Sequence, residues 1–295
     1  MTHPQSKPVN LSRRKTALTA GAMCLTAIFV TVSIARGADQ NTGSIPDFSP
    51  NADTGWQLSD DEFILPASGP GPITFDPAHP YISFYRFPRN PNPTFRVADL
   101  SNPILQPWTR EALKQVNEKS LSGKYVAIPK ERCWPVGVPA FDLLPATPVY
   151  FLQTPKVVTM IWTQDHQVRQ VYLNAAHSTK LKPSWFGESV GHYEGDTLIV
   201  DTIGLSTKTF VDNYQTPHTE QLHVIERYRI ADGGKTLEVN IHVEDPGAFT
   251  TPWNAIQRYR RSETGPMPET VCAENNEDHF NQDIGPMPIA DKPEF

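Results

Sequence analysis

Histidine is concentrated in the C-terminal half of the chain. Seven of the nine histidines lie between residues 166 and 279, namely His166, His177, His192, His218, His223, His242 and His279. Imidazole groups beside carboxylates commonly transfer protons in enzymes, with histidine as the base and the carboxylate as the group that orients it. We therefore predict that His192, His218, His223 and Glu226 form a catalytic site suited to isomerisation, hydration or elimination.

The spacing of these residues also bears on metal binding. His218 and His223 are five residues apart in a region of β character, so they do not share one face as the two histidines of a helical zinc motif do. Ligands from different strands can still converge on one ion. A metal-dependent hydrolase or lyase that uses His218, His223 and either His192 or Glu226 is therefore the second hypothesis, and our first prediction includes no metal.

A further set of polar and aromatic residues is predicted to contact a ligand. The set consists of Arg169, Tyr172, Trp185, Glu188, Asp201 and Trp253. Asp201 stands in the apolar run 199–202, where a carboxylate faces either solvent or a partner in the interior. Each residue of both sets also has a purely structural role open to it, such as capping a turn or packing in the core. A non-catalytic envelope protein is the third hypothesis.

Several other chemistries lack their sequence signatures. There is no phosphate-binding loop, no dinucleotide fingerprint and no Cys-x-x-Cys pair, so the sequence predicts no cofactor. Residues 187–191 match Gly-x-Ser-x-Gly, but that motif requires a strand-to-helix turn in an α/β sheet. The surrounding residues indicate a β-hairpin instead, which argues against a serine hydrolase.

Short β segments must position these residues. Turns at 194–196 and 232–234 separate runs that are rich in branched and aromatic side chains. The predicted strands cover 149–153, 157–163, 168–174, 189–193, 197–202, 222–230, 236–245 and 255–261. An antiparallel meander barrel leaves none of them at an open edge. A barrel of about eight strands can hold one small ligand, so the predicted partner is a small apolar or amphipathic molecule.

The barrel domain is predicted to span residues 108–280. It begins with one short helix near 110–121, for which Thr109 can provide the N-cap. Residues 36–107 are predicted to be a Pro-rich extension, mobile up to about residue 60, because twelve prolines fall within 39–107. Residues 281–295 form a C-terminal tail.

Residues 1–35 have the pattern of a signal peptide. Basic residues at 13–15 precede an apolar stretch that runs to Ala35. Cleavage after Ala35 would place the protein in the periplasm or outside the cell, whereas an uncleaved stretch of this length can anchor it in a membrane. Cys133 and Cys272 remain after cleavage and are predicted to form a disulfide.

The charge of the chain bears on its partners. The removed segment contains four of the 26 basic residues and none of the 32 acidic ones. The remaining chain is therefore acidic, and an acidic chain without basic clusters repels phosphate backbones. Nucleic acid is excluded as a partner, and a membrane is a partner only if the N-terminal segment stays uncleaved.

Three motifs carry a resemblance to known proteins. They are Cys-Trp-Pro-Val-Gly-Val-Pro at 133–139, Gly-Glu-Ser-Val-Gly-His-Tyr-Glu-Gly-Asp-Thr-Leu at 187–198 and Pro-His-Thr-Glu-Gln-Leu-His-Val-Ile-Glu-Arg at 217–227. Together they resemble a widespread, largely uncharacterised family of secreted bacterial proteins over about residues 95–280. That resemblance implies secretion but no known activity. The strand order also resembles calycin-like barrels, the lipocalin and fatty-acid-binding architecture, which implies a ligand-binding barrel.

Overall fold

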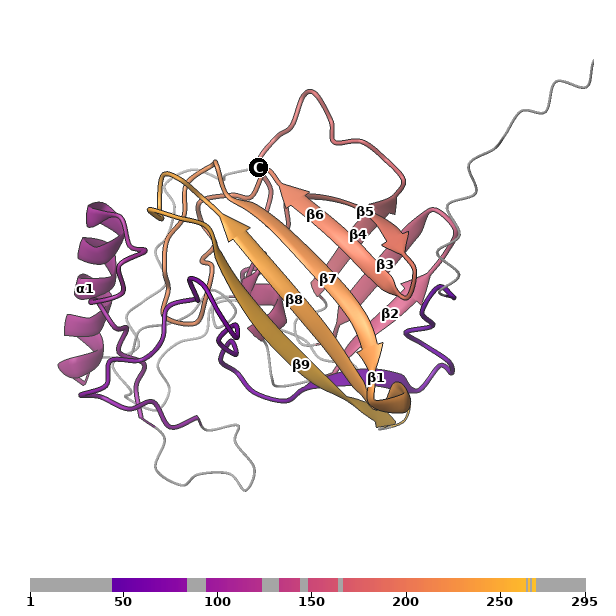
Figure 1. Cartoon of the computed structure of the whole chain (residues 1–295), viewed down its shortest axis with the longest axis horizontal. Coiled ribbons are helices and arrows are strands. Elements are labelled where there is room, and N and C mark those ends of the chain that lie inside the picture. The colour runs from indigo at the N-terminus through magenta and orange to yellow at the C-terminus, as the bar shows by residue number, and fades with distance from the viewer. Residues whose placement is uncertain are drawn as a thin grey trace, which may run out of the picture. The chain divides into compact units, whose positions relative to one another are not determined.

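A computed structural model describes residues 44–83, 94–123, 133–143, 148–163, 167–263, 265 and 267–268. Nine strands form one closed barrel (Figure 1). The strands are β1 (Thr54–Leu58), β2 (Val149–Gln153), β3 (Val157–Trp162), β4 (Gln167–Leu173), β5 (Glu188–Glu194), β6 (Thr197–Ile203), β7 (His223–Ala231), β8 (Thr236–Glu244) and β9 (Trp253–Glu263). The predicted mainly β barrel with one α-helix is therefore confirmed for these residues.

The barrel closes through a strand that the sequence did not reveal. β1 pairs with β2 at Trp56 and Val149, and with β9 over its whole length, from Thr54 opposite Glu263 to Leu58 opposite Tyr259. β1 lies within the segment that we predicted to be a partly mobile, Pro-rich extension. The N-terminal part of the chain thus supplies a wall of the barrel.

One strand pair departs from the predicted antiparallel meander. β4 and β5 are parallel, with Val171 opposite Ser189 and Leu173 opposite Gly191. The prediction was wrong at this pair because residues 174–187 do not form a hairpin. A connection of this length is enough for a crossover, which parallel strands require. A lipocalin is an up-and-down barrel, so the parallel pair leaves the lipocalin assignment unconfirmed. We call residues 174–187 the crossover segment.

The interior of the barrel is filled by side chains. Successive residues of a strand point to opposite faces, and the inward residues of β8 (Leu237, Val239, Ile241 and Val243) are all buried. Aromatic residues from other segments join them: Phe48 packs on Phe151, and Phe249 packs edge-on against Trp253. Burying each large apolar side chain contributes about 1.5–3 kcal/mol. The barrel therefore has a packed core with buried aromatic clusters.

The helix α1 (Pro107–Leu121) begins two residues before the predicted cap. Pro107 occupies the first turn, where its missing N–H is harmless. Thr109 is instead buried, and its hydroxyl donates to the carbonyl oxygen of Ala248 at 2.9 Å. The side chain of Asn117 exchanges hydrogen bonds with the backbone of Ala98. α1 is thus fixed to its surroundings by polar contacts as well as by Leu113, which is fully buried.

Some predictions concern residues outside the described part of the chain. Residues 1–35, Cys272 and the tail 281–295 belong to this group, so the signal peptide or anchor, the disulfide and the tail stay predictions. Within the described residues, none of the helices has the length and hydrophobicity needed to cross a bilayer.

We expect the mature protein to contain a disulfide between Cys133 and Cys272. An oxidising compartment favours the bond, and closing a loop of about 139 residues contributes roughly 4–5 kcal/mol in the chain-entropy model. Mass spectrometry after alkylation under denaturing conditions should find two more labels with reductant than without it. Two labelled thiols in the non-reduced protein would contradict the prediction, and a Cys133→Ser/Cys272→Ser variant gives the unlabelled baseline.

Candidate functional site

Two of the predicted site residues meet inside the barrel. Arg169 on β4 and Glu226 on β7 are both completely buried, and the Arg169 guanidinium binds both carboxylate oxygens of Glu226. The remaining guanidinium donors reach the hydroxyl of Thr202 at 2.9 Å and that of Ser189 at 3.3 Å. Every one of these side chains lies at an inward position of its strand.

Asp142 and two tyrosines complete this internal network. Tyr259 donates to Asp142 at 2.6 Å, and Tyr228 donates to Glu226 at 2.9 Å. Burial and the nearby Glu226 raise the pKa of Asp142 well above its usual range. Burial also opposes the charge of Glu226, but Arg169 holds the pKa of that carboxyl below its usual range. The network therefore contains one buried ion pair and a carboxyl group, Asp142, whose protonated form burial favours, and its members satisfy one another through hydrogen bonds.

A second group of predicted residues forms a row on the outside of the barrel. His177 of the crossover segment contacts Glu188 on β5 at 3.1 Å and Asp201 on β6 at 3.0 Å. His223 on β7 contacts the same oxygen of Asp201 at 3.0 Å and lies 3.6 Å from Glu244 on β8. The row continues to His242, which lies 2.9 Å from Glu244. Six titratable side chains thus alternate between imidazole and carboxylate across four strands and the crossover segment. We call them the histidine–carboxylate row.

The two contacts of His177 define its role in this row. A carboxylate oxygen can only accept a hydrogen bond, and both ring nitrogens of His177 face one. The charged form of the ring satisfies both contacts, whereas a neutral ring satisfies one. The backbone N–H of Ser178 also donates to Glu188. His177 and Ser178 therefore pin the start of the crossover segment to β5 and β6.

A cleft of about 570 Å³ lies between the crossover segment and the outer face of β4. Val168, Gln170 and Tyr172 of β4 line one side, and Val168 and Tyr172 are about half exposed. The crossover segment lines the other side with residues from Ser178 to Gly187, among them Lys180, Leu181, Lys182 and Phe186. Glu188 and Ser189, at the start of β5, complete the lining. We call this space the crossover cleft.

The end of the cleft depends on Gly187. Its φ of +64° is strained for other residues, and a Cβ atom there would lie 2.4 Å from the carbonyl oxygen of Ile203. Ser184 adds a short parallel bridge to the same region, since its N–H donates to Gly204 at 3.0 Å and its carbonyl accepts from Ser206. The crossover segment is therefore held at both ends, with the cleft between them.

The other predicted residues lie apart from both groups. His192 is exposed beside Glu194, whereas His218 is buried in a loop between the hydroxyl of Thr209 and the carbonyl oxygen of Thr219. Burial lowers the pKa of His218 and so favours its neutral form. These contacts correspond to the turn-stabilising role that the sequence offered as its structural alternative. Trp185 packs on Trp134 with ring centroids 5.6 Å apart.

These positions bear on the first two hypotheses. His192, His218, His223 and Glu226 do not converge: they lie on the outside of β5, in a loop, on the outside of β7 and inside the barrel. In the part of the chain that the structure describes, no three or more His, Cys, Asp or Glu side chains are grouped so as to hold a metal ion. The structure therefore does not bring the four predicted catalytic residues together in one place.

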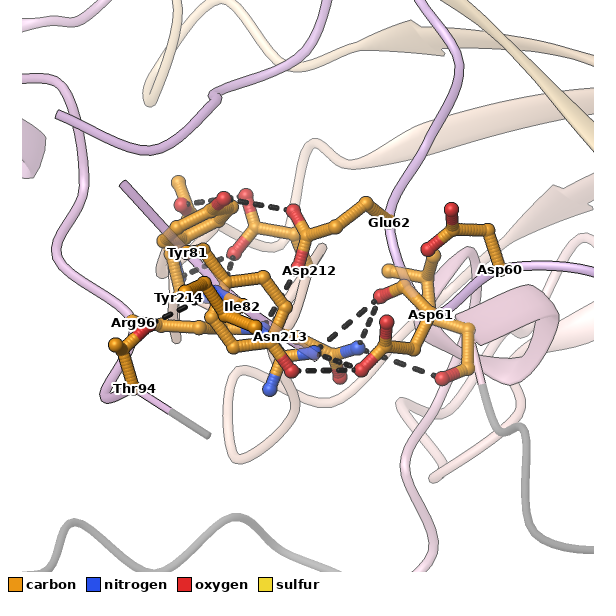
Figure 2. Close-up of polar contacts among 12 residues, drawn as sticks. Asp60, Asp61, Glu62, Tyr81, Ile82, Thr94, Arg96, Asp212, Asn213 and Tyr214 are labelled. Carbon is orange, nitrogen blue, oxygen red and sulfur yellow. Dashed lines mark hydrogen bonds and ion pairs between the residues drawn. The ribbon is translucent and has the colours of Figure 1, made fainter. Parts of the chain in front are cut away.

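Sequence reasoning missed a third polar group, the acidic cluster around Arg96 (Figure 2). Arg96 donates to Glu62 at 2.7 Å and pairs with Asp61, and its guanidinium lies 4.1 Å from the ring centre of Tyr81. Tyr214 donates to the other oxygen of Glu62 at 2.7 Å. The signal in the sequence is the run of three acids at 60–62, but Arg96 is 34 residues farther along the chain.

The cluster has more acid than base. Burial raises the pKa of Glu62 to about 7, although Arg96 and Tyr214 oppose this effect. Asp212 lies in the loop beside Tyr214, and burial raises its pKa to about 6. Perturbed carboxyl groups occur at functional sites and in structural ion-pair networks alike. Tyr214 donates to Glu62 and Asn213 donates to the carbonyl oxygen of Asp61, so the cluster joins the loop at 212–214 to residues 61 and 62, which Arg96 also binds.

Comparisons with known proteins give no further guidance. No family model, no curated protein and no solved structure matches the chain. The family resemblance seen in the sequence motifs therefore stays a prediction, and the function must be inferred from the site itself.

Proposed function

We propose that the protein binds a small amphipathic anion in the crossover cleft, without catalysing a reaction on it. The observation that carries the proposal is the composition of the cleft. Lys180 and Lys182 line it beside the apolar side chains of Leu181 and Phe186. A ligand with an apolar body and a negatively charged head matches both kinds of surface.

The electrostatics of the two lysines support this ligand class. Within the described residues, neither Lys180 nor Lys182 takes part in an ion pair, whereas the nearby Glu188 already accepts from His177 and Ser178. The two lysine ammonium groups are therefore available to bind an anion, whereas the Glu188 carboxylate is already hydrogen-bonded. Glu188 and Tyr172, two of the residues predicted from the sequence to contact a ligand, belong to this cleft.

Binding without catalysis agrees with where the acid–base groups lie. Both nitrogens of His177 face carboxylates, so neither is directed at a substrate. The proposed protein is thus a periplasmic or secreted binding barrel, as the N-terminal segment and the resemblance to secreted bacterial proteins imply. Its ligand site lies outside the barrel wall, since the interior is filled.

We expect decanoate, a simple amphipathic anion, to bind the protein and to bind a Lys180→Gln/Lys182→Gln variant at least about tenfold more weakly. A charge-assisted contact contributes about 1.5–3 kcal/mol, and 1.4 kcal/mol corresponds to a factor of ten in affinity. Isothermal titration calorimetry of the mature chain measures both affinities. Lys235→Gln, which removes an exposed lysine outside the cleft, is the matched control and should bind like the wild type.

Two results would contradict the proposal. One is an unchanged decanoate affinity in the double lysine variant. The other is equal affinity for decanol, which has the same apolar body and no charge. If neither result is found, native mass spectrometry of the protein purified from its own periplasm would identify the natural ligand of the cleft.

A further inference from the structure

A second cleft, of about 340 Å³, lies over the outer face of β7, β8 and β9. Its roof comes from the segment that follows β1. Ile64 exchanges backbone hydrogen bonds with Ile256, and Asn254 donates to the carbonyl oxygen of Pro70, so residues 64–70 run beside β9 where β1 has ended. Pro66, Ala67 and Ser68 line the cleft from this side. We call it the edge cleft.

The floor of the edge cleft is rich in hydrogen-bond donors. Arg227 and Asn240 are direct neighbours across β7 and β8, and Asn254 stands opposite His242 across β8 and β9. The side-chain oxygen of Asn254 is 2.8 Å from His242, which leaves the amide NH₂ group of Asn254 as a donor. Ile256, which is partly exposed on the same face as Asn254, supplies an apolar part of the floor.

The charge balance of this cleft differs from that of its surroundings. Arg227 has no ion-pair partner among the described residues, although Arg229 on the same strand and Arg258 on β9 both pair with Glu238. None of the residues that line the edge cleft is acidic. Glu244 on β8, a member of the histidine–carboxylate row, is already bound to His242. A free guanidinium therefore stands in an acid-free cleft on an otherwise acidic chain.

We propose that the edge cleft binds a small molecule bearing a carboxylate, with Arg227 as its main anchor. A guanidinium matches a carboxylate in a two-point contact, and neighbouring amide donors add to it. The apolar residues beside Arg227 accommodate a flat or compact apolar body. This site is separate from the crossover cleft in its residues and does not depend on the function proposed there.

Benzoate is a suitable probe because it combines a carboxylate with a small flat ring. In a nuclear magnetic resonance titration of the mature chain, benzoate should shift the amide signals of Arg227, Asn240 and Asn254. Benzamide, which has the same shape without the charge, should bind at least about tenfold more weakly, as the loss of a charge-assisted contact implies. Arg227→Gln should weaken benzoate binding by a similar factor.

Arg229→Gln is the matched control, since it removes the neighbouring arginine that pairs with Glu238 and does not line the cleft. It should bind benzoate like the wild type. Both side chains are exposed, so both variants should keep the fold and unfold at the same temperature as the wild type. The proposal is overturned if benzoate gives no shifts, if the shifts map to residues 168–188 instead, or if Arg227→Gln leaves the affinity unchanged.

Discussion

Replacing Arg169 with Met should destabilise the barrel by about 3–5 kcal/mol, the usual cost of removing one partner of a buried ion pair. The substitution leaves the Glu226 carboxylate in the filled interior without the guanidinium that pairs with it, and the hydrogen bonds from Tyr228 and Asp142 do not replace that charge. Urea unfolding followed by tryptophan fluorescence measures the loss. Glu226→Gln, a conservative change, should also destabilise the barrel, because it leaves the buried Arg169 guanidinium without its carboxylate partner.

The double variant Arg169→Met/Glu226→Gln makes the test specific. If the pair acts as a unit, the double variant should lose less stability than the two single variants together, by an interaction energy of about 1–3 kcal/mol. Arg258→Met is the surface control: its pair with Glu238 is half exposed, so the loss should stay within about 1 kcal/mol. A loss of that small size for Arg169→Met would refute the structural role of the internal network.

The acidic cluster should make folding stability fall as the pH rises through the neutral range. Glu62 has an ordinary pKa of 4.5 when the chain is unfolded and about 7 when it is folded. Between these values the folded protein binds a proton that the unfolded chain has lost, so its stability decreases as the pH increases. A difference of this size corresponds to about 3 kcal/mol, present below pH 4.5 and lost by pH 7. Asp212, with a folded pKa of about 6, adds to the effect in the lower part of the window.

The comparison with Glu62→Gln isolates this effect. Other groups titrate in the same range, including His218, whose lowered pKa acts in the opposite direction. The stability of Glu62→Gln minus that of the wild type should therefore be measured at several pH values. We expect the difference to rise by about 3 kcal/mol between pH 5 and pH 8. Glu220, an exposed acid without an ion pair among the described residues, gives the control Glu220→Gln. A difference for Glu62→Gln that stays constant with pH would disprove the prediction.

The sequence predicted most of the strands because their alternation is strong. In β8, four apolar residues alternate with polar ones, and two tight turns mark neighbouring hairpins. β1 was missed because its five residues, Thr-Gly-Trp-Gln-Leu, lie in a Pro-rich segment and show little alternation. The parallel pair was missed because nothing local distinguishes a long hairpin loop from a crossover. The predicted strand 168–174 included Asn174, but β4 ends at Leu173, and Asn174, with a φ of +55°, turns the chain out of the strand.

The site residues were predictable by type but not by grouping. The alternation of β4 and β7 places Arg169 and Glu226 on the same face as their buried neighbours, so a charged pair in the interior could have been derived. Grouping Glu188, Asp201 and His223 required the position of His177, which lies in a segment without regular structure. Arg227, Lys180 and Lys182 carried no pattern at all, because a free charge is recognisable only after its neighbours are known.

The pairing of β1 with β9 has a consequence for how the protein folds. Thr54 lies opposite Glu263, so the contact that closes the barrel joins the first and the last strand of the sheet. Contacts between residues this far apart in sequence give a high contact order, which slows folding because a long chain segment must be ordered before the contact forms. Closure therefore belongs to the last steps of folding. Until β9 has formed, β1 has only its short pairing with β2, and residues 64–70 lack the strand to which they bond, so the roof of the edge cleft is among the last parts of the structure to assemble.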